Sequence, residues 1–385
     1  MKKILSISLI LVLVLSVFSG CGGGTDKSDT SPIQIGSIMP ISGPVSAYGT
    51  QSRDAIVMAI DEINAAGGVL GRQLQVTVED DQANPETTKN AFTKLVTKDG
   101  VIAIIGALTS KCSLAITSDA QARKIIMISP SSTNDTVTDA GDYIFRACYN
   151  DSFQGQVVAQ FAYENLKATK AAILFDNTND YSKGLSETFK AKFIASGGTI
   201  VAEESYATGD KDFNAQITNV KSKNPEIIFI PDYYNTVSLI AKQVRAQGIT
   251  VPMLGADGWD EIVNNAGDEV VGCYYSNHYS PDANDPEVKA FVEKYTKLYN
   301  VQPNALAALA YDATYIVADA ITKAGSVDPE AIKEAMMLTD KKFVTGNIKF
   351  DAKRNPIKSA VMVEIVKGAT ANHPTVKYAA TVNPQ

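Results

Sequence analysis

Short apolar segments alternate with longer amphipathic ones from residue 33 onward. Ile33 to Met39 alternates apolar and polar residues, which predicts a strand with one buried face. Apolar residues then recur at helical spacing from Ile56 to Ile63, and the glycines of "AAGGVLG" end this predicted helix. Asn84-Pro85 predicts the start of a second helix, with Asn as the N-cap and Pro in the first turn. The order of elements is that of an α/β domain.

The alternation occurs in two series. The continuous apolar runs at 101–105 and 125–128 are typical of central parallel strands that are buried on both faces. A second series of strands is predicted at 171–175, 199–206, 227–230 and 251–254, with helices near 183–195, 213–222 and 236–247. Two successive βαβ series predict two doubly wound α/β lobes. The tail is less regular, with helices predicted at 285–299 and 304–323 and strands at "NIKFD" and "SAVMVEIV".

Hydroxyl side chains gather where two successive strands of the first series end. Thr109, Ser110 and Ser113 follow one apolar run, and the next run is followed by Ser129, Ser131, Ser132 and Thr133. Ligands of open α/β sheets bind at the carboxyl ends of strands, so this placement predicts a ligand site. Helix capping is the alternative explanation, and one residue can serve both purposes.

The N-terminus has the features of a secretion signal. Met1-Lys2-Lys3 is basic, the stretch from Ile4 to Phe18 is almost wholly apolar, and Ser19-Gly20-Cys21 follows. The apolar stretch is shorter than the roughly 20 residues of a transmembrane helix. Cysteine after "FSG" resembles a bacterial lipobox, although Phe18 stands where Leu is usual. We therefore expect a lipoprotein signal peptide at 1–20, lipidation at Cys21 and a flexible Gly/Ser/Asp tether over 21–32. A signal peptide cut nearby, with an incidental cysteine, is the alternative.

Composition narrows the function. Apolar residues make up 45% of the chain and charged residues 20%, as in a globular protein, and the net charge of −7 argues against a nucleic-acid partner. Besides Cys21, the chain has Cys112, Cys148 and Cys273, which allow one disulfide but show no CxxC or Cys/His metal spacing. The chain has two histidines and neither GxSxG nor HExxH, so we expect no catalytic activity, metal or cofactor.

From Ile33 to about Val366 the chain resembles the type I periplasmic binding proteins, and within them the leucine/isoleucine/valine-binding receptors of ABC transporters. The matching stretches are "IGSIMPISGPVSAYGTQSRDAIVMAIDEINAAGGVLGRQLQVTVEDDQANP", "IAIIGALTS", "IMISPSST", "NDYSKG", "GDKDFNAQI" and "GNIKFDAKRN". The resemblance implies two Rossmann-like lobes joined by a three-strand hinge near 145–150, 273–276 and 348–351. Lobe 1 would comprise 33–147 plus 277–350, and lobe 2 would comprise 148–276 plus 351–385.

The resemblance also implies a free amino acid bound between the lobes. Ser110 and Thr133 match residues that bind the carboxylate. The backbone carbonyl of Ser131 and the side chain of Asp257 match groups that bind the ammonium, with Asp257 standing where relatives carry Glu. Aromatic site positions match Tyr48, Tyr233 and Tyr311, with Tyr181 on the rim of the second lobe; a one-residue shift from Tyr233 to Tyr234 is an alternative. The remaining predicted site residues are Leu108, Thr109 and Ser132.

The function that follows is an extracytoplasmic, lipid-anchored receptor of an ABC importer. Leucine, isoleucine or valine is the expected ligand; alanine, an aromatic amino acid or an amine-free carboxylate is the alternative. The expected partners are the permease complex and the membrane through the N-terminal lipid only, with the receptor itself a monomer. A ligand-sensing lipoprotein of a signalling system is the alternative function.

Overall fold

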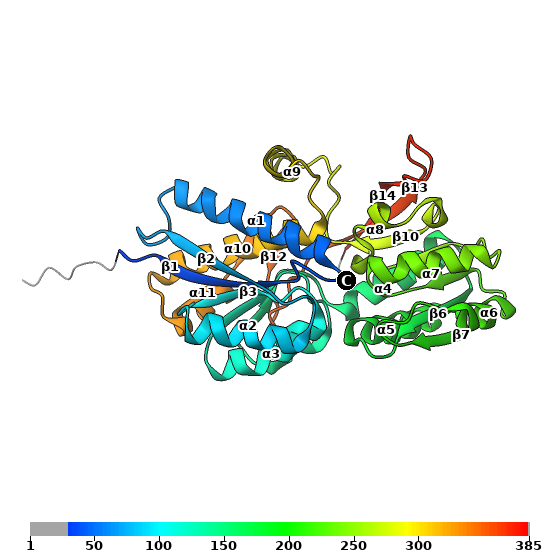
Figure 1. The fold of residues 1–385 in the computed structure, drawn as a ribbon, viewed down its shortest axis with the longest axis horizontal. Helices are drawn as coiled ribbons and strands as arrows, with labels where there is room; N and C mark the ends of the chain where they lie inside the picture. Colours follow the sequence, from blue (N-terminus) through cyan, green and yellow to red (C-terminus); the bar gives the residue numbers. More distant parts are fainter. Residues whose placement is uncertain (1–29, 384–385) are drawn as a thin grey trace, which may run out of the picture. The chain divides into compact units, whose positions relative to one another are not determined.

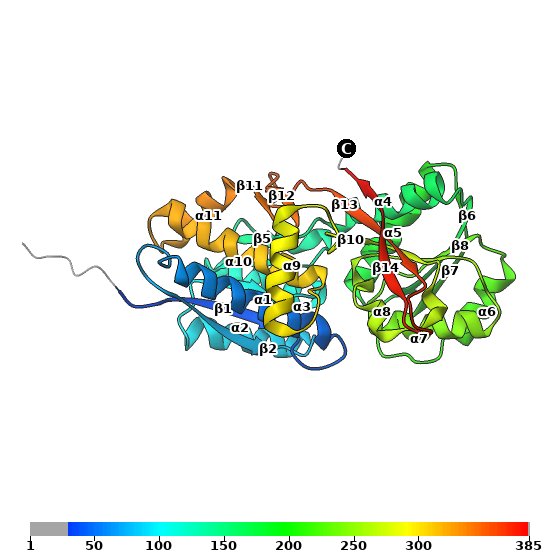
Figure 2. The same ribbon diagram turned by 90° about the horizontal axis from the view of Figure 1, so that it is seen from above.

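The computed structural model describes residues 30–383. The predicted signal peptide, Cys21 and all of the predicted tether before residue 30 lie outside the described residues. The described chain forms two mainly parallel sheets, each covered by helices on both faces, and a small hairpin (Figures 1 and 2). We call the five-stranded sheet with its helices the first lobe and the seven-stranded sheet with its helices the second lobe. The predicted α/β class with two doubly wound lobes is confirmed.

The sheet of the first lobe is wholly parallel, with strand order β2-β1-β3-β4-β5. Its strands are β1 (Ile33–Met39), β2 (Leu74–Asp80), β3 (Ala103–Gly106), β4 (Ile126–Ser129) and β5 (Ile144–Arg146). The helices of this lobe are α1 (Ser46–Ala65), α2 (Pro85–Thr97), α3 (Ser110–Ala122), α9 (Pro286–Tyr299), α10 (Ala305–Ala324) and α11 (Pro329–Met337). The hairpin of β11 (Asp340–Phe343) and β12 (Gly346–Lys349) completes it.

Alternate residues of these strands belong to different apolar layers. Ile33 and Ile105 pack with α1 and α10, whereas Ile38 and Ile104 pack with α2 and α3. This is the burial on both faces that the continuous apolar runs predicted. The helix α10 is long and apolar enough to cross a membrane, but most of it is buried between α1, α11 and the sheet, as in the core helix of a globular domain.

The second sheet has the order β14-β13-β10-β9-β8-β6-β7. Its strands are β6 (Lys170–Asp176), β7 (Thr199–Tyr206), β8 (Ile227–Phe229), β9 (Met253–Gly255), β10 (Tyr274–Asn277), β13 (Ala360–Val366) and β14 (Thr375–Val382). In this sheet the pairs β10–β13 and β13–β14 are antiparallel, and the other pairs are parallel. Helices α4 (Asp151–Gln160) and α5 (Asp180–Ala195) pack on one face, and α6 (Asn214–Ser222), α7 (Tyr234–Ala246) and the short α8 (Ile262–Asn265) pack on the other.

The predicted helix start at Asn84 and helix end at the glycines after α1 are confirmed in the structure. Asn84 accepts hydrogen bonds from the N–H groups of Glu86 and Thr87, so it caps α2 as predicted. Gly68 follows α1 with a φ of +74°, and a Cβ there would lie 2.1 Å from the carbonyl oxygen of Arg72. The three described cysteines are buried and unpaired, so no disulfide links them.

Candidate functional site

A small cavity lies where strands of both sheets end. Its first-lobe wall follows β3 and β4, and its second-lobe wall follows β8 and β9 and includes the first turn of α5. This is the strand-end position at which open α/β sheets bind ligands. The lining residues are Tyr48, Leu108, Thr109, Ser110, Ser131, Tyr181, Tyr233, Asp257, Gly258 and Leu306. The structure therefore brings together eight of the eleven predicted site residues.

The first-lobe wall presents the beginning of α3. Ser110 is the first residue of this helix, and its Oγ accepts the backbone N–H of Asn134 at 3.2 Å, which leaves the hydroxyl proton available to a ligand. The first N–H groups of a helix have no acceptor within the helix and carry the positive end of its dipole. The Ser131 hydroxyl donates to the carbonyl of Leu108 at 2.9 Å and thereby ties the two hydroxyl loops together. This wall suits a carboxylate.

Two of the predicted hydroxyl residues do not line the cavity. The Ser132 Oγ lies 3.1–3.3 Å from the carbonyl oxygens of Ala107 and Leu108 and 2.8 Å from the Ser113 Oγ, so it braces the loops. Thr133 is fully buried, and its Oγ1 has no hydrogen-bond partner among the described residues. Neighbouring side chains in this run of hydroxyl residues lie in different surroundings. The sequence alone does not show which of them face the cavity.

Three side chains hold the Asp257 carboxyl group, and they come from α4, from α5 and from the residue after β10. Its Oδ1 accepts the Tyr181 hydroxyl at 2.8 Å and the Gln154 Nε2 at 3.0 Å, and its Oδ2 lies 3.1 Å from the His278 Nε2. Burial lowers the pKa of His278, which favours the neutral ring, and this ring stacks on Tyr149 at 3.9 Å between centroids. Neutral donors fix the orientation of the carboxylate and leave its charge for a cation.

The residue after Asp257 must be glycine because the backbone is crowded there. A Cβ on Gly258 would lie 2.7 Å from the Tyr181 hydroxyl and 2.8 Å from the carbonyl oxygen of Asp232. The Gly258 N–H donates to the same Tyr181 hydroxyl at 2.9 Å, and its carbonyl accepts the Tyr48 hydroxyl from the first lobe at 2.6 Å. Gly258 therefore couples both lobes to the cavity wall.

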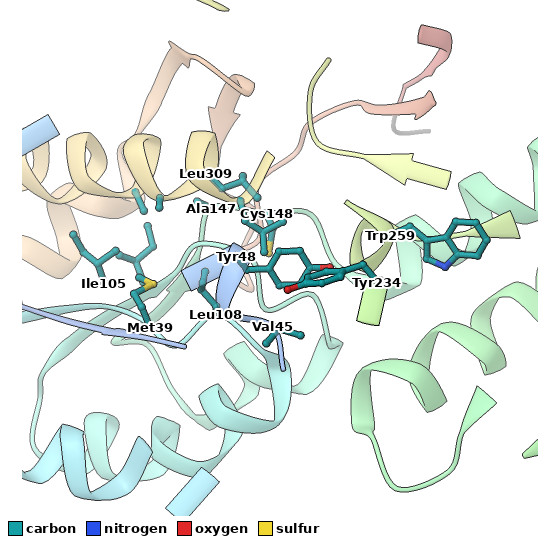
Figure 3. Packing of buried hydrophobic residues seen from close by; sticks show 14 of the residues in the cluster. Met39, Val45, Tyr48, Ile105, Leu108, Ala147, Cys148, Tyr234, Trp259 and Leu309 are labelled. Atoms are coloured by element: carbon teal, nitrogen blue, oxygen red, sulfur yellow. The ribbon is translucent and has the colours of Figure 1, made fainter. Parts of the chain in front are cut away.

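Aromatic rings close the remaining sides. Tyr181 and Tyr233 stack with centroids 5.1 Å apart, and Tyr48 meets both Tyr233 and Tyr234 edge to face. Figure 3 shows Tyr48 and Tyr234 against each other, with Leu108 on one side and Trp259 beyond on the other. Tyr233 lines the cavity, and Tyr234 does not. The alternative of a one-residue shift is therefore not supported.

Tyr311 does not reach the cavity, which corrects the prediction for this residue. Its hydroxyl hydrogen-bonds to Glu62 of α1, and its ring packs at 5.0 Å from Phe291 of α9. Leu306, which lies on α10 as Tyr311 does, lines the cavity instead. Five residues along an α-helix rotate the side chain by roughly 140°, so the two residues face different directions.

Asp151, the first residue of α4, is a buried acid that does not line the cavity but is affected by the charge of Asp257, and the sequence did not reveal it. It is fully buried, and neither carboxylate oxygen has a hydrogen-bond partner among the described residues. Burial and then the charge of Asp257 raise the pKa of Asp151 well above its ordinary value. The nearby Arg146 donates through its Nη atoms to the carbonyls of Ser132, Asn134 and Asp135. The nearby Thr133 hydroxyl acts in the opposite direction to burial and lowers the pKa of Asp151.

Comparisons with known proteins agree with this geometry. The family model described as "Periplasmic binding protein" matches residues 32–370. A leucine-, isoleucine-, valine-, threonine- and alanine-binding protein of Pseudomonas aeruginosa is 32% identical over 325 residues, which cover 83% of this chain and 86% of that protein.

Two solved structures are similar over most of the chain. A leucine binding protein from Thermotoga maritima is 36% identical with a TM-score of 0.86, covering 91% of this chain and 99% of that chain. A branched-chain amino acid transporter substrate binding protein from Streptococcus pneumoniae, in complex with isoleucine, is 35% identical with a TM-score of 0.83, covering 90% of this chain and 100% of that chain. Strand order, strand-end cavity and sequence similarity agree, and the chain belongs to the periplasmic binding protein family.

Proposed function

We propose that this protein is the substrate-binding receptor of an ABC importer and that it binds a free amino acid with an apolar side chain, leucine, isoleucine or valine, between its lobes. The observation that carries this proposal is the pairing of a helix N-terminus with Ser110 on one side of the cavity and a buried, uncompensated carboxylate on the other. A zwitterion needs both charges matched when it leaves water. The similar proteins from Pseudomonas and Streptococcus bind ligands of this class by name.

The ammonium would lie between Asp257 and Asp151. Asp257 is oriented by Gln154, Tyr181 and His278, whereas Asp151 has unused acceptors. Charge-assisted hydrogen bonds contribute roughly 1.5–3 kcal/mol each, and a cation also relieves the repulsion between the two carboxylates. The carbonyl of Ser131 is a further acceptor in this proposal.

The carboxylate would lie at the beginning of α3. The hydroxyls of Ser110 and Thr133 and the first N–H groups of the helix are its proposed donors, with Thr109 and Leu108 shaping the loop. The side chain would then face Tyr48, Tyr233 and Leu306, three cavity-lining residues without a charged group. Such a wall favours an aliphatic side chain through burial of apolar surface.

The receptor would act outside the cytoplasm and deliver its ligand to a permease complex in the membrane. The sequence "VFSGCGGG" supports lipidation at Cys21, with residues 1–20 as signal peptide and the residues up to 32 as tether. Lobe 1 would comprise 33–147 plus 277–350 and lobe 2 148–276 plus 351–385. We expect a monomeric receptor that closes on its ligand because ligand contacts favour the closed state.

A thermal-shift screen tests the proposal. The mature chain from residue 21, with Cys21→Ser to prevent lipidation, is unfolded and refolded to remove carried ligand and then tested against the twenty amino acids and their 2-oxo acids. A ligand at 100 times its Kd adds about 2.7 kcal/mol to the free energy of unfolding, which gives a clear rise in melting temperature. We expect shifts for leucine, isoleucine and valine. Shifts for the 2-oxo acids alone would contradict the ammonium site.

A further inference from the structure

Four buried polar side chains connect the lobes outside the ligand cavity. Gln51 lies on α1, Asn304 is the N-cap of α10, and Asp260 and Glu261 follow β9 in the second lobe. We call these four residues the latch. Each is less than one-tenth exposed, and none of them lines the cavity.

The Glu261 carboxylate is the centre of the latch. Its Oε1 accepts the Gln51 Nε2 at 2.7 Å and the Asn304 Nδ2 at 2.9 Å, both from the first lobe. Gln51 in turn accepts the Asn304 backbone N–H on its Oε1 at 2.8 Å. The amide of Gln51 is therefore oriented by the first lobe before it meets Glu261, so the contact is geometrically defined rather than a loose surface contact.

Asp260 makes a second connection, to the N-terminus of α10. Its Oδ2 accepts the N–H of Ala305, the first residue of that helix, at 2.6 Å, and its Oδ1 accepts the Asn277 Nδ2 at 3.1 Å. A carboxylate from the second lobe thus caps a 20-residue helix of the first lobe. When the lobes separate, this N–H loses its acceptor.

The backbone of the latch segment is held in an unusual conformation. Glu261 has a φ of +72°, a left-handed conformation that a non-glycine residue adopts at a cost. The segment is also adjacent to Gly258, whose carbonyl accepts the Tyr48 hydroxyl. One short segment after β9 therefore carries both a wall of the cavity and the latch.

From this geometry we propose that Gln51, Asn304, Asp260 and Glu261 set the equilibrium between open and closed lobes, and thereby the ligand affinity, without contacting the ligand. The inference rests on the proposed function, because it assumes that the lobes close on an amino acid. A ligand that binds only the closed state has an apparent Kd inversely proportional to the population of that state. The latch residues are thus positioning residues that change the affinity for every ligand by the same factor.

The first test compares Glu261→Ala with Asn264→Ala. Asn264 donates to the other oxygen of the same carboxylate, Oε2, at 2.7 Å, but it belongs to the second lobe and is exposed. We expect Glu261→Ala to raise the Kd for leucine and for alanine by the same factor, about 10- to 100-fold, since it removes two cross-lobe hydrogen bonds to a carboxylate. Asn264→Ala should change the Kd about twofold at most. Equal effects of the two variants, or a factor that differs between ligands, would overturn the inference.

A double-mutant cycle checks that the effect passes between the lobes. Gln51→Ala alone should weaken binding, and in the Glu261→Ala background it should add little, because its partner is already absent. Additive effects would show that the two side chains act separately. Ligand-free melting temperatures of the three variants, measured in parallel, exclude chains that have not folded.

A second readout needs no ligand, so it separates this inference from the proposed function. Spin labels at the exposed positions Lys89 on α2 and Glu187 on α5 report the distance between the lobes, because the described native cysteines are buried. Glu261→Ala should shift the ligand-free distance distribution toward the open state. If no amino acid binds the wild-type chain, the proposed function fails while this measurement still decides the latch. An unchanged distance distribution in Glu261→Ala would overturn the inference about the latch.

Discussion

Asp257 and Asp151 are both buried, but their surroundings differ. Asp257 accepts hydrogen bonds from Gln154, Tyr181 and His278, which fix the orientation of its carboxyl group. Asp151 lacks such a set of hydrogen bonds among the described residues; burial and the charge of Asp257 raise its pKa, and the nearby Thr133 hydroxyl lowers it less. Asp257 is thus oriented before a ligand arrives, whereas the surroundings of Asp151 disfavour its ionised form.

One substitution separates the charge of the Asp257 side chain from its size. Asp257→Asn keeps the size of the side chain and the acceptor for Gln154 and Tyr181 but removes the charge. We expect the Kd for leucine to rise at least about 30-fold, because the ammonium loses its buried counter-charge. Calorimetry with leucine and with the matching 2-oxo acid measures this. The 2-oxo acid has no ammonium, so its affinity should not weaken, and equal losses for both ligands would refute the assignment.

The raised pKa of Asp151 predicts that ligand binding releases a proton. In the ligand-free protein its raised pKa favours the neutral form, and a bound ammonium stabilises the ionised form and lowers the pKa. Binding therefore releases a proton, and affinity weakens as the pH falls through the ligand-free pKa. Calorimetry in two buffers of different ionisation enthalpy measures the release. Asp151→Asn should abolish it, and a variant that still releases the same proton would locate the titration elsewhere.

The positions of site residues were most predictable where a residue directly follows a strand. Ser110, Ser131 and Asp257 follow strands and line the cavity, as the resemblance implied. Asp151 was missed because an acid after Asn150 at a helix start is an ordinary capping pattern, and only tertiary packing buries it. Tyr311 was misplaced because its helix was correctly predicted while the direction of its side chain depends on packing against α1 and α9.

At the scale of elements, long and strongly patterned segments were predicted accurately. The predicted bounds of β1 and β7 agree with the structure, and the predicted first turn of α2 contains its Asn84 cap. Short strands were harder: β5 has three residues and β11 is mostly exposed, so neither shows a hydrophobic period of its own. Their strand state depends on neighbours that are distant in sequence.

The segment after β9 predicts a pH effect on lobe closure. Burial, followed by the charge of Glu261, raises the pKa of Asp260 to about 7, whereas its ordinary value is 3.8. If separation of the lobes restores the ordinary value, closure takes up a proton, and Asp260 strengthens binding by about tenfold as the pH falls from 8 to 6. The ratio of the wild-type Kd to the Asp260→Asn Kd, measured at both pH values, should fall by that factor.

The comparison with Asp260→Asn isolates this effect from other titrating groups. Asp232 also has a pKa raised to about 7, but its hydrogen bonds to Tyr206 and to the Tyr233 N–H lie within the second lobe. It therefore contributes equally to open and closed states. A ratio that stays constant between pH 8 and pH 6 would mean that Asp260 does not change its protonation on closure.

At the scale of the whole molecule, contacts between the lobes flank the cavity on two sides. The latch and the Tyr48–Gly258 hydrogen bond lie on one side. Beside α3, the Asn134 Nδ2 donates to the carbonyl of Asp180 at 2.9 Å, and the Lys111 Nζ lies 3.4 Å from the carbonyl of Thr178. A cavity bounded in this way admits a ligand only when at least one set of contacts opens, so the described arrangement corresponds to a closed state.

Small-angle X-ray scattering measures this closure directly. We expect the refolded, ligand-free chain to have a larger radius of gyration than the leucine-saturated chain, whose scattering should fit the arrangement described. Asp257→Asn should stay in the larger form at a leucine concentration that closes the wild type, because the ligand then gains too little from the closed state to shift the equilibrium. At a concentration well above its own raised Kd, the same variant should become compact, since the latch and the contacts beside α3 are intact. A variant that binds leucine but never becomes compact would show that Asp257 takes part in closure itself and not only in holding the ammonium.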